Sequence, residues 1–107
     1  MEKFVEQTLL YDFYGELLTE RQRQVYENVL LEDYSLSEVA GELGISRQGV
    51  HDMIRRCNKT LEGYEEKLHL VEKFLEIRKN VKIIEKLAEK EGNDEIMKIS
   101  EAILEEL

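Results

Sequence analysis

The chain has 107 residues, 36% of them charged, with one cysteine and no proline. This length suits one domain, or a small domain with an extension. The lone Cys57 excludes an internal disulfide and fits a reducing cytoplasm, and no apolar run reaches the length of a membrane span. The N-terminus also lacks the pattern of an export signal. We therefore predict a cytoplasmic all-α protein without membrane insertion.

The formal net charge of -9 argues against binding to a phosphate backbone, because that affinity comes chiefly from Lys and Arg. Residues 1–34 hold three basic and eight acidic side chains, residues 35–60 hold four and three, and residues 61–107 hold eight and thirteen. Only the central segment escapes the acidic excess. Any nucleic-acid contact is therefore expected in residues 35–60.

The first expected helix covers residues 2–18, where Tyr11, Phe13, Tyr14 and Leu17 contribute to a broad apolar face. These aromatic rings could pack as a core or could offer a platform for stacking bases. Aromatic residues at helical spacing are more often core, so we interpret them as the surface against which the rest of the domain packs.

The second expected helix runs from Glu20 to Asp33. Thr19 followed by Gln22 has the spacing of a capping box, in which each residue's side chain bonds the other's backbone. This helix would bury Val25, Tyr26, Val29 and Leu30. It would supply the third wall of the motif that follows.

Residues 35–61 have the pattern of a helix-turn-helix. Ser35 with Glu38 predicts a helix start, and Ala40 is small enough for a second helix to cross closely. Gly44 can adopt the left-handed conformation of a helix end, and Ser46 can cap the next helix two residues later. An ordinary helical hairpin in a bundle is the alternative. The second helix would turn Val50, Met53, Ile54, Cys57 and Leu61 inward.

The opposite face of this second helix is polar and basic. We predict that it binds DNA through Ser46, Arg47, Gln48, His51, Arg55, Arg56 and Lys59. Two neighbouring residues weaken this prediction. Asp52 would face phosphate or accept a hydrogen bond from cytosine, and Gly49 lowers helix stability in the first turns.

The remaining sequence predicts a helical hairpin. We expect Gly63 to kink or end the recognition helix and a long helix to follow from Tyr64 to Lys90. Gly92 and Asn93 then break the chain, and Asp94 is expected to cap a final helix. The expected apolar face of that helix is Ile96, Ile99, Ile103 and Leu107. The predicted domains are thus a helix-turn-helix domain, residues 1–62, and an extension, residues 63–107.

The long helix carries apolar residues at steps of four and three, which is the spacing of a coiled-coil seam. A short final helix is too narrow to cover a seam of this width, so we predict a two-fold homodimer. Its expected interface consists of Leu70, Phe74, Ile77, Val81 and Ile84. The alternative is a monomer in which the first helix covers the remaining apolar surface.

The sequence gives little support for catalysis. It has no glycine-rich phosphate loop and no paired cysteines, and His51 and His69 lack the spacing of metal ligands. Cys57 lies on the inward stripe, which favours a packed thiol over a nucleophile. We predict no catalytic residue, no metal site and no cofactor, and therefore no enzyme.

The stretch LTERQRQVYENVLLEDYSLSEVAGELGISRQGVHDMIRRCNKTL resembles the region-4 helix-turn-helix of bacterial sigma factors, which reads a promoter element. With its aromatic first helix, the ISRQGVHD turn and the long acidic C-terminal helix, the whole chain more closely resembles the YlxM family of small bacterial proteins. That resemblance implies a regulator associated with the signal recognition particle pathway. It also implies that Ser46, Arg47 and Gln48 open the recognition helix toward the major groove.

Two functions remain open at this point. The first is a dimeric regulator of transcription that presents its two recognition helices to DNA. The second is an adaptor that contacts protein or RNA of the targeting machinery through its helical surfaces, with its acidic helices against a basic partner. The motif favours the first function and the small local charge excess favours the second.

Overall fold

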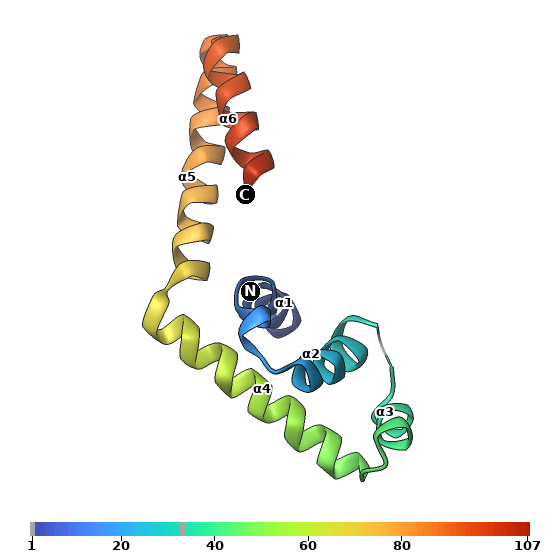
Figure 1. Cartoon of the computed structure of the whole chain (residues 1–107). Coiled ribbons are helices and arrows are strands. Elements are labelled where there is room, and N and C mark those ends of the chain that lie inside the picture. The colour runs from blue at the N-terminus through green and yellow to red at the C-terminus, as the bar shows by residue number, and fades with distance from the viewer. Residues whose placement is uncertain (1, 33) are drawn as a thin grey trace. The chain divides into compact units, whose positions relative to one another are not determined.

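A computed structural model describes residues 2–32 and 34–107, and the side chains of all of these except Phe4. This part of the chain contains six α-helices and no strand, which confirms the all-α prediction (Figure 1). The helices are α1 (Lys3–Tyr14), α2 (Glu20–Tyr26), α3 (Leu36–Leu43), α4 (Arg47–Leu68), α5 (Leu70–Glu91) and α6 (Asp94–Glu106). None of the helices in the described ranges is long and apolar enough to cross a membrane.

The chain divides into two compact units, Met1–Leu68 and His69–Leu107, called here the N-terminal and C-terminal units. The sequence predicted this division at Gly63, and the expected helix break there is wrong. α4 continues through Gly63 because the residues on both sides of it are held: Leu61 is fully buried, and the ring of Tyr64 packs against that of Tyr14. The break instead falls at His69, which has a left-handed backbone with φ of 55°.

The first helix is shorter than the predicted 2–18. α1 ends at Tyr14, and residues Gly15–Leu17 form a 3₁₀ turn. The ring of Tyr11 lies directly over Gly15, where a Cβ atom would stand 2.7 Å from the ring. Only glycine permits this approach.

The second helix starts as predicted and ends differently. Both hydrogen bonds of the Thr19–Gln22 capping box are present. After Tyr26 the chain continues as a π-helical turn, Glu27–Leu31, rather than as regular α-helix. The predicted end at Asp33 lies outside the described residues.

Aromatic residues of the first two helices contribute to the core, as predicted. Tyr14 and Tyr26 are each 1% exposed, and the ring of Tyr11 stacks on that of Tyr26 with centroids 5.2 Å apart. Cys57 and Leu61 of α4 are fully buried with them. Other members of the predicted apolar face remain exposed, namely Phe13 and Leu17.

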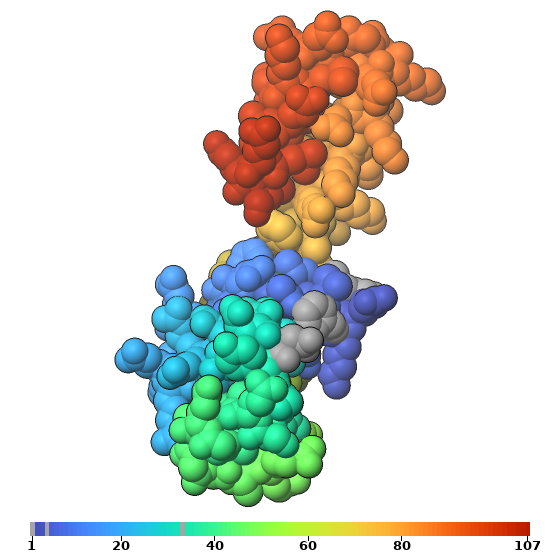
Figure 2. All heavy atoms as spheres, turned by 90° about the vertical axis from the view of Figure 1, so that its right-hand side faces the viewer, coloured from blue at the N-terminus to red at the C-terminus, as the bar shows by residue number. Residues whose placement is uncertain are grey.

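The C-terminal unit is the predicted helical hairpin. α6 runs back along α5, and Figure 2 shows the two helices side by side. Gly92 ends α5 with a left-handed backbone, and the cap of α6 is Asn93, whose side chain accepts a hydrogen bond from the Ile96 N–H at 3.1 Å. The predicted cap, Asp94, is instead the first helical residue.

The buried row of α6 differs from the one expected. Ser100 is 2% exposed and its hydroxyl donates to the Ile96 carbonyl at 2.8 Å. The predicted apolar face is instead exposed, at Ile96, Ile99, Ile103 and Leu107. The single α5 helix buries one strip of α6, and that strip is the one that contains Ser100.

Candidate nucleic-acid interface

The corner between α3 and α4 has the capping geometry of a helix-turn-helix. Ser35 caps α3 by accepting a hydrogen bond from the Glu38 N–H at 3.1 Å. Gly44 ends that helix with φ of 69°, and Ser46 caps α4 by accepting from the Gly49 N–H at 2.9 Å. Each of these positions has the role predicted from the sequence. Only two residues, Ile45 and Ser46, separate Gly44 from the first residue of α4, so the turn is tight.

A small apolar core fixes the angle of this corner. Val25 of α2, Val39 and Ala40 of α3 and Val50 of α4 are buried together. Six partly buried residues surround them: Val29, Leu36, Leu43, Ile45, Met53 and Ile54. Because α2, α3 and α4 all contribute, the motif is a three-helix domain and not an isolated hairpin (Figure 1). Its exposed surface along α4 is therefore held in place by packing from behind.

All seven side chains predicted to bind DNA are exposed on the surface of α4 and its cap. They form two groups. Arg47, Gln48 and His51 line one shallow hollow at the start of α4, together with Leu36 of α3. Arg55, Arg56 and Lys59 line a second one further along the same helix. Ser46 caps the helix between the corner and the first group.

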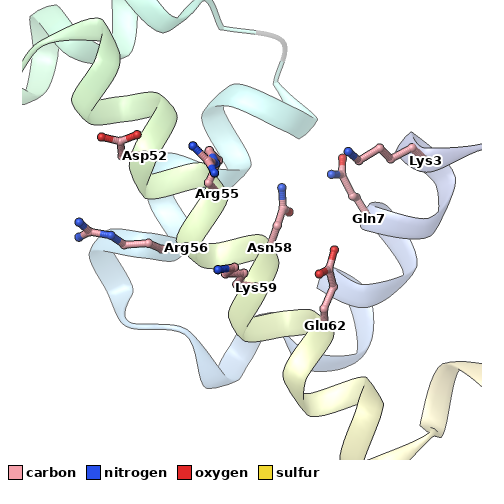
Figure 3. A pocket seen from close by; sticks show the side chains of 8 residues that line it. All are labelled: Lys3, Gln7, Asp52, Arg55, Arg56, Asn58, Lys59 and Glu62. Atoms are coloured by element: carbon pink, nitrogen blue, oxygen red, sulfur yellow. The ribbon is translucent and has the colours of Figure 1, made fainter.

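The second hollow is a groove of about 390 Å³ with walls from α1 and α4 (Figure 3). α1 contributes Lys3 and Gln7, and both extend toward α4 in Figure 3. Arg56 points away from these two residues, toward the other side of α4. The groove therefore gathers basic groups from two helices that are far apart in sequence.

Lys3, Gln7 and Asn58 were missed in the sequence analysis. A signal for the first two exists, because Lys3, Gln7, Leu10 and Tyr14 follow one another at steps of four, three and four and so share one face of α1. Leu10 and Tyr14 are buried. Because Lys3 and Gln7 lie on the same face of α1 as these two buried residues, they are placed at the edge of α4.

Positive charge predominates around this groove. Its lining includes four cations, Lys3, Arg55, Arg56 and Lys59, and two carboxylates, Asp52 and Glu62. The chain as a whole carries -9. The surface along α4 is thus a local exception to the acidic character of the protein, and it could accept a polyanion.

Asn58, a polar residue that lines the groove, is held in place by a hydrogen bond from the buried Tyr26. The Tyr26 hydroxyl donates a hydrogen bond to the Asn58 carbonyl oxygen at 2.7 Å. Burial raises the pKa of Tyr26 well above its usual range, so the phenol stays protonated and keeps donating. This contact orients the Asn58 amide in the groove wall.

Asp52, the acidic residue within the predicted binding face, is engaged within α4. Its carboxylate accepts a hydrogen bond from the Gln48 amide at 3.1 Å, and the Nδ1 atom of His51 lies 4.0 Å from the same oxygen. The carboxylate therefore fixes the Gln48 side chain. It also reduces the positive charge of this surface.

The fold and the capped corner define the chain as a helix-turn-helix protein. The chain belongs to the UPF0122 family, whose profile matches residues 1–103 and is described as "Putative helix-turn-helix protein, YlxM / p13 like". This confirms the resemblance identified from the sequence. The description concerns a helix-turn-helix family and indicates no catalytic activity.

Relatives match over nearly the whole chain. A UPF0122 protein of Thermoanaerobacter sp. (strain X514) is 47% identical over 110 residues, which cover 99% of this chain and 94% of the relative. Another, from Acetivibrio thermocellus, is 45% identical over 114 residues, covering 100% and 97%. A third, from Bacillus cereus (strain AH187), is 42% identical over 105 residues, covering 96% of each. The family thus includes both units of this chain.

Proposed function

We propose that this protein is a regulator that binds nucleic acid through the exposed face of α4. The observation that carries the proposal is the gathering of four cations around one groove in a chain whose net charge is -9. The capped corner and the packed core behind it support the same function, because they hold the basic surface rigid. The resemblance to the YlxM family adds a proposed role in the signal recognition particle pathway.

In this proposal the two groups on α4 have different tasks. Arg47 and Gln48 lie in the first turns, where a recognition helix meets base edges, and the fixed Gln48 amide can bond an adenine or a phosphate. Arg55, Arg56 and Lys59, with Lys3 from α1, neutralise phosphates along the backbone. Nucleic-acid binding of this kind requires no catalytic residue, metal or cofactor.

The decisive experiment measures binding to a random DNA duplex and to signal recognition particle RNA across a salt series. The proposal predicts that affinity falls steeply with salt, because bound counterions are released. The double variant Arg55→Ala/Lys59→Ala removes two of the proposed phosphate contacts. We expect it to flatten the salt dependence by roughly two ion equivalents for duplex DNA.

The matched control is Arg21→Ala/Lys67→Ala, which removes the same charge from exposed positions of the N-terminal unit outside the groove. If both double variants weaken binding equally, the effect comes from net charge and the proposed surface is wrong. If the wild-type protein binds neither nucleic acid at low salt, the proposal fails.

A second candidate function is an adaptor for protein of the targeting machinery. The strongly acidic segments, residues 1–34 and 61–107, favour it, because such surfaces suit a basic partner. The experiment measures binding to the GTPase protein of the signal recognition particle. Binding that persists in Arg55→Ala/Lys59→Ala, with no affinity of the wild-type protein for nucleic acid, would favour the adaptor and reject the regulator.

A further inference from the structure

The C-terminal unit leaves a large apolar surface uncovered. Six aliphatic residues of the hairpin are between 39% and 56% exposed: Ile77, Ile84, Leu87, Ile96, Ile99 and Ile103. By contrast, Val81 and Ala88 of α5 are buried within the hairpin. The two helices therefore cover only one strip of each other and leave a second apolar strip on each helix.

The exposed strips of α5 and α6 have the same position relative to the buried ones. In α5, Ile77 and Ile84 stand four residues before and three residues after the buried Val81. At about 100° per residue, the directions in which Ile77 and Ile84 leave the helix axis differ from that of Val81 by about 40–60°, and both lie to the same side of it. The strip of α6 repeats this spacing around a different buried residue.

In α6, Ile96 and Ile103 stand four residues before and three residues after the buried Ser100. Two antiparallel helices in contact are related by a two-fold axis that is normal to the plane of the hairpin. Because each exposed strip is rotated by the same angle and in the same sense from the buried residues of its own helix, this axis places both exposed strips on one side of the hairpin. The six exposed aliphatic residues of α5 and α6 thus lie on one side of the hairpin, and this surface, which includes Leu87, is called here the isoleucine face. A different face of α5 carries Arg78 and Lys82, together with the exposed Ile83.

We infer that this isoleucine face is the surface through which two copies of the chain associate. The six residues expose on the order of 500 Å², which is large for a patch on a monomer and most of the roughly 800 Å² per partner of a standard interface. An identical face on a second copy presents the same aliphatic side chains, so pairing the two buries apolar surface against apolar surface. Two hairpins packed in this way form a four-helix bundle.

This surface differs from the dimer interface predicted from the sequence. Val81, one of the five residues of the predicted interface, is buried inside the hairpin and is not available to a second chain. Of the five predicted residues, Ile77 and Ile84 belong to the isoleucine face. The α6 residues were absent from the prediction and contribute half of the face.

The test is sedimentation equilibrium of the full chain from about 1 to 100 µM, the range that resolves micromolar association. We expect the wild-type mass to approach twice 12.7 kDa. The variant Ile84→Glu/Ile99→Glu places a carboxylate on each strip, and we expect it to weaken association more than about 100-fold. A monomeric wild-type protein over the whole range would overturn the inference without any variant.

The control variant Arg78→Gln/Lys82→Gln changes the net charge by the same amount on a different face of α5, and it should remain dimeric. Circular dichroism of each variant verifies that helix content is kept. Dissociation of the control to the same extent would show that charge and not the isoleucine face decides. Because nucleic-acid binding is measured separately, a monomer that still binds DNA rejects this inference and leaves the proposed function standing.

Discussion

The Gln48 amide donates a hydrogen bond of 3.1 Å to the Asp52 carboxylate one turn further along α4. Both side chains belong to the face that we propose for nucleic-acid binding. Asp52 therefore has two opposing effects there. It orients a side chain that can read a base, and it repels the phosphates that the neighbouring arginines attract.

Replacing Asp52 with Asn separates these two effects. Asn keeps an oxygen that can accept from Gln48 and removes the negative charge, so we expect duplex DNA to bind about three to ten times more tightly at low salt. Fluorescence anisotropy measures the change. Glu20→Gln, which removes one exposed charge at the start of α2, should have little effect. Weaker binding of Asp52→Asn would contradict the proposed surface.

Gly41, inside α3, and Gly44, the residue that follows its end, form a matched pair of sites. Neither would bring an added Cβ within 4 Å of another atom, but only Gly44 has a positive φ, 69°. Gly44→Ala should therefore lower the free energy of unfolding by about 1–2 kcal/mol through backbone strain alone. Gly41→Ala, inside the helix, should raise it by about 0.5–1 kcal/mol. Urea denaturation compares the two, and effects of the same sign would refute the assigned end of α3.

Gly63 offers a test of the continuity of α4. A Cβ atom added there meets nothing within 4 Å, and the helix runs without interruption from Arg47 to Leu68. We expect Gly63→Ala to stabilise the protein by about 0.5–1 kcal/mol. Thermal unfolding followed by circular dichroism is sufficient as a measurement. A loss of stability would mean that the chain needs the flexibility of glycine at this point.

The burial of Cys57 should lower the free energy of unfolding at alkaline pH. Burial raises the pKa of its thiol above the usual 9.0, so the unfolded state releases the proton at lower pH than the folded state does. This contribution to stability is complete below pH 9.0 and is lost as the pH rises through the folded pKa, at up to about 1.4 kcal/mol per pH unit.

Urea denaturation at several pH values on both sides of 9.0 measures this slope. Cys57→Ala should flatten it. Val50→Ala, at another fully buried position without a titrating group, should lower stability and leave the slope unchanged. An identical slope in the wild-type protein and Cys57→Ala would show that Cys57 does not contribute. Tyr26, whose pKa is also raised by burial, acts in the same direction above pH 10.0.

The local signals in the sequence predicted the corner accurately. Capping residues such as Ser35 and Ser46 and the left-handed Gly44 act through neighbouring backbone atoms, so their positions in the chain suffice. The exposed face of α4 could likewise be predicted, because helical spacing also depends only on the positions of residues in the chain. The family resemblance added the class of protein.

Features that depend on tertiary packing were predicted less well. Gly63 has a low helix propensity, but the packing of Leu61 and Tyr64 on either side outweighs it. In α6 the apolar spacing of the isoleucines is strong, yet the strip that contacts α5 is the one with Ser100. Spacing identifies an apolar strip and does not say which partner covers it. The contribution of Lys3 to the groove likewise required the crossing of α1 and α4.

The close contact between Gly15 and the Tyr11 ring links a remote turn to the groove. That ring stacks on Tyr26, and the Tyr26 hydroxyl in turn orients Asn58. A methyl group at Gly15 would have to push the first ring aside, and the displacement would travel through two aromatic side chains to the wall of the groove. The residue type at Gly15, in a turn with no role in binding, is thereby restricted by the shape of the groove wall at Asn58.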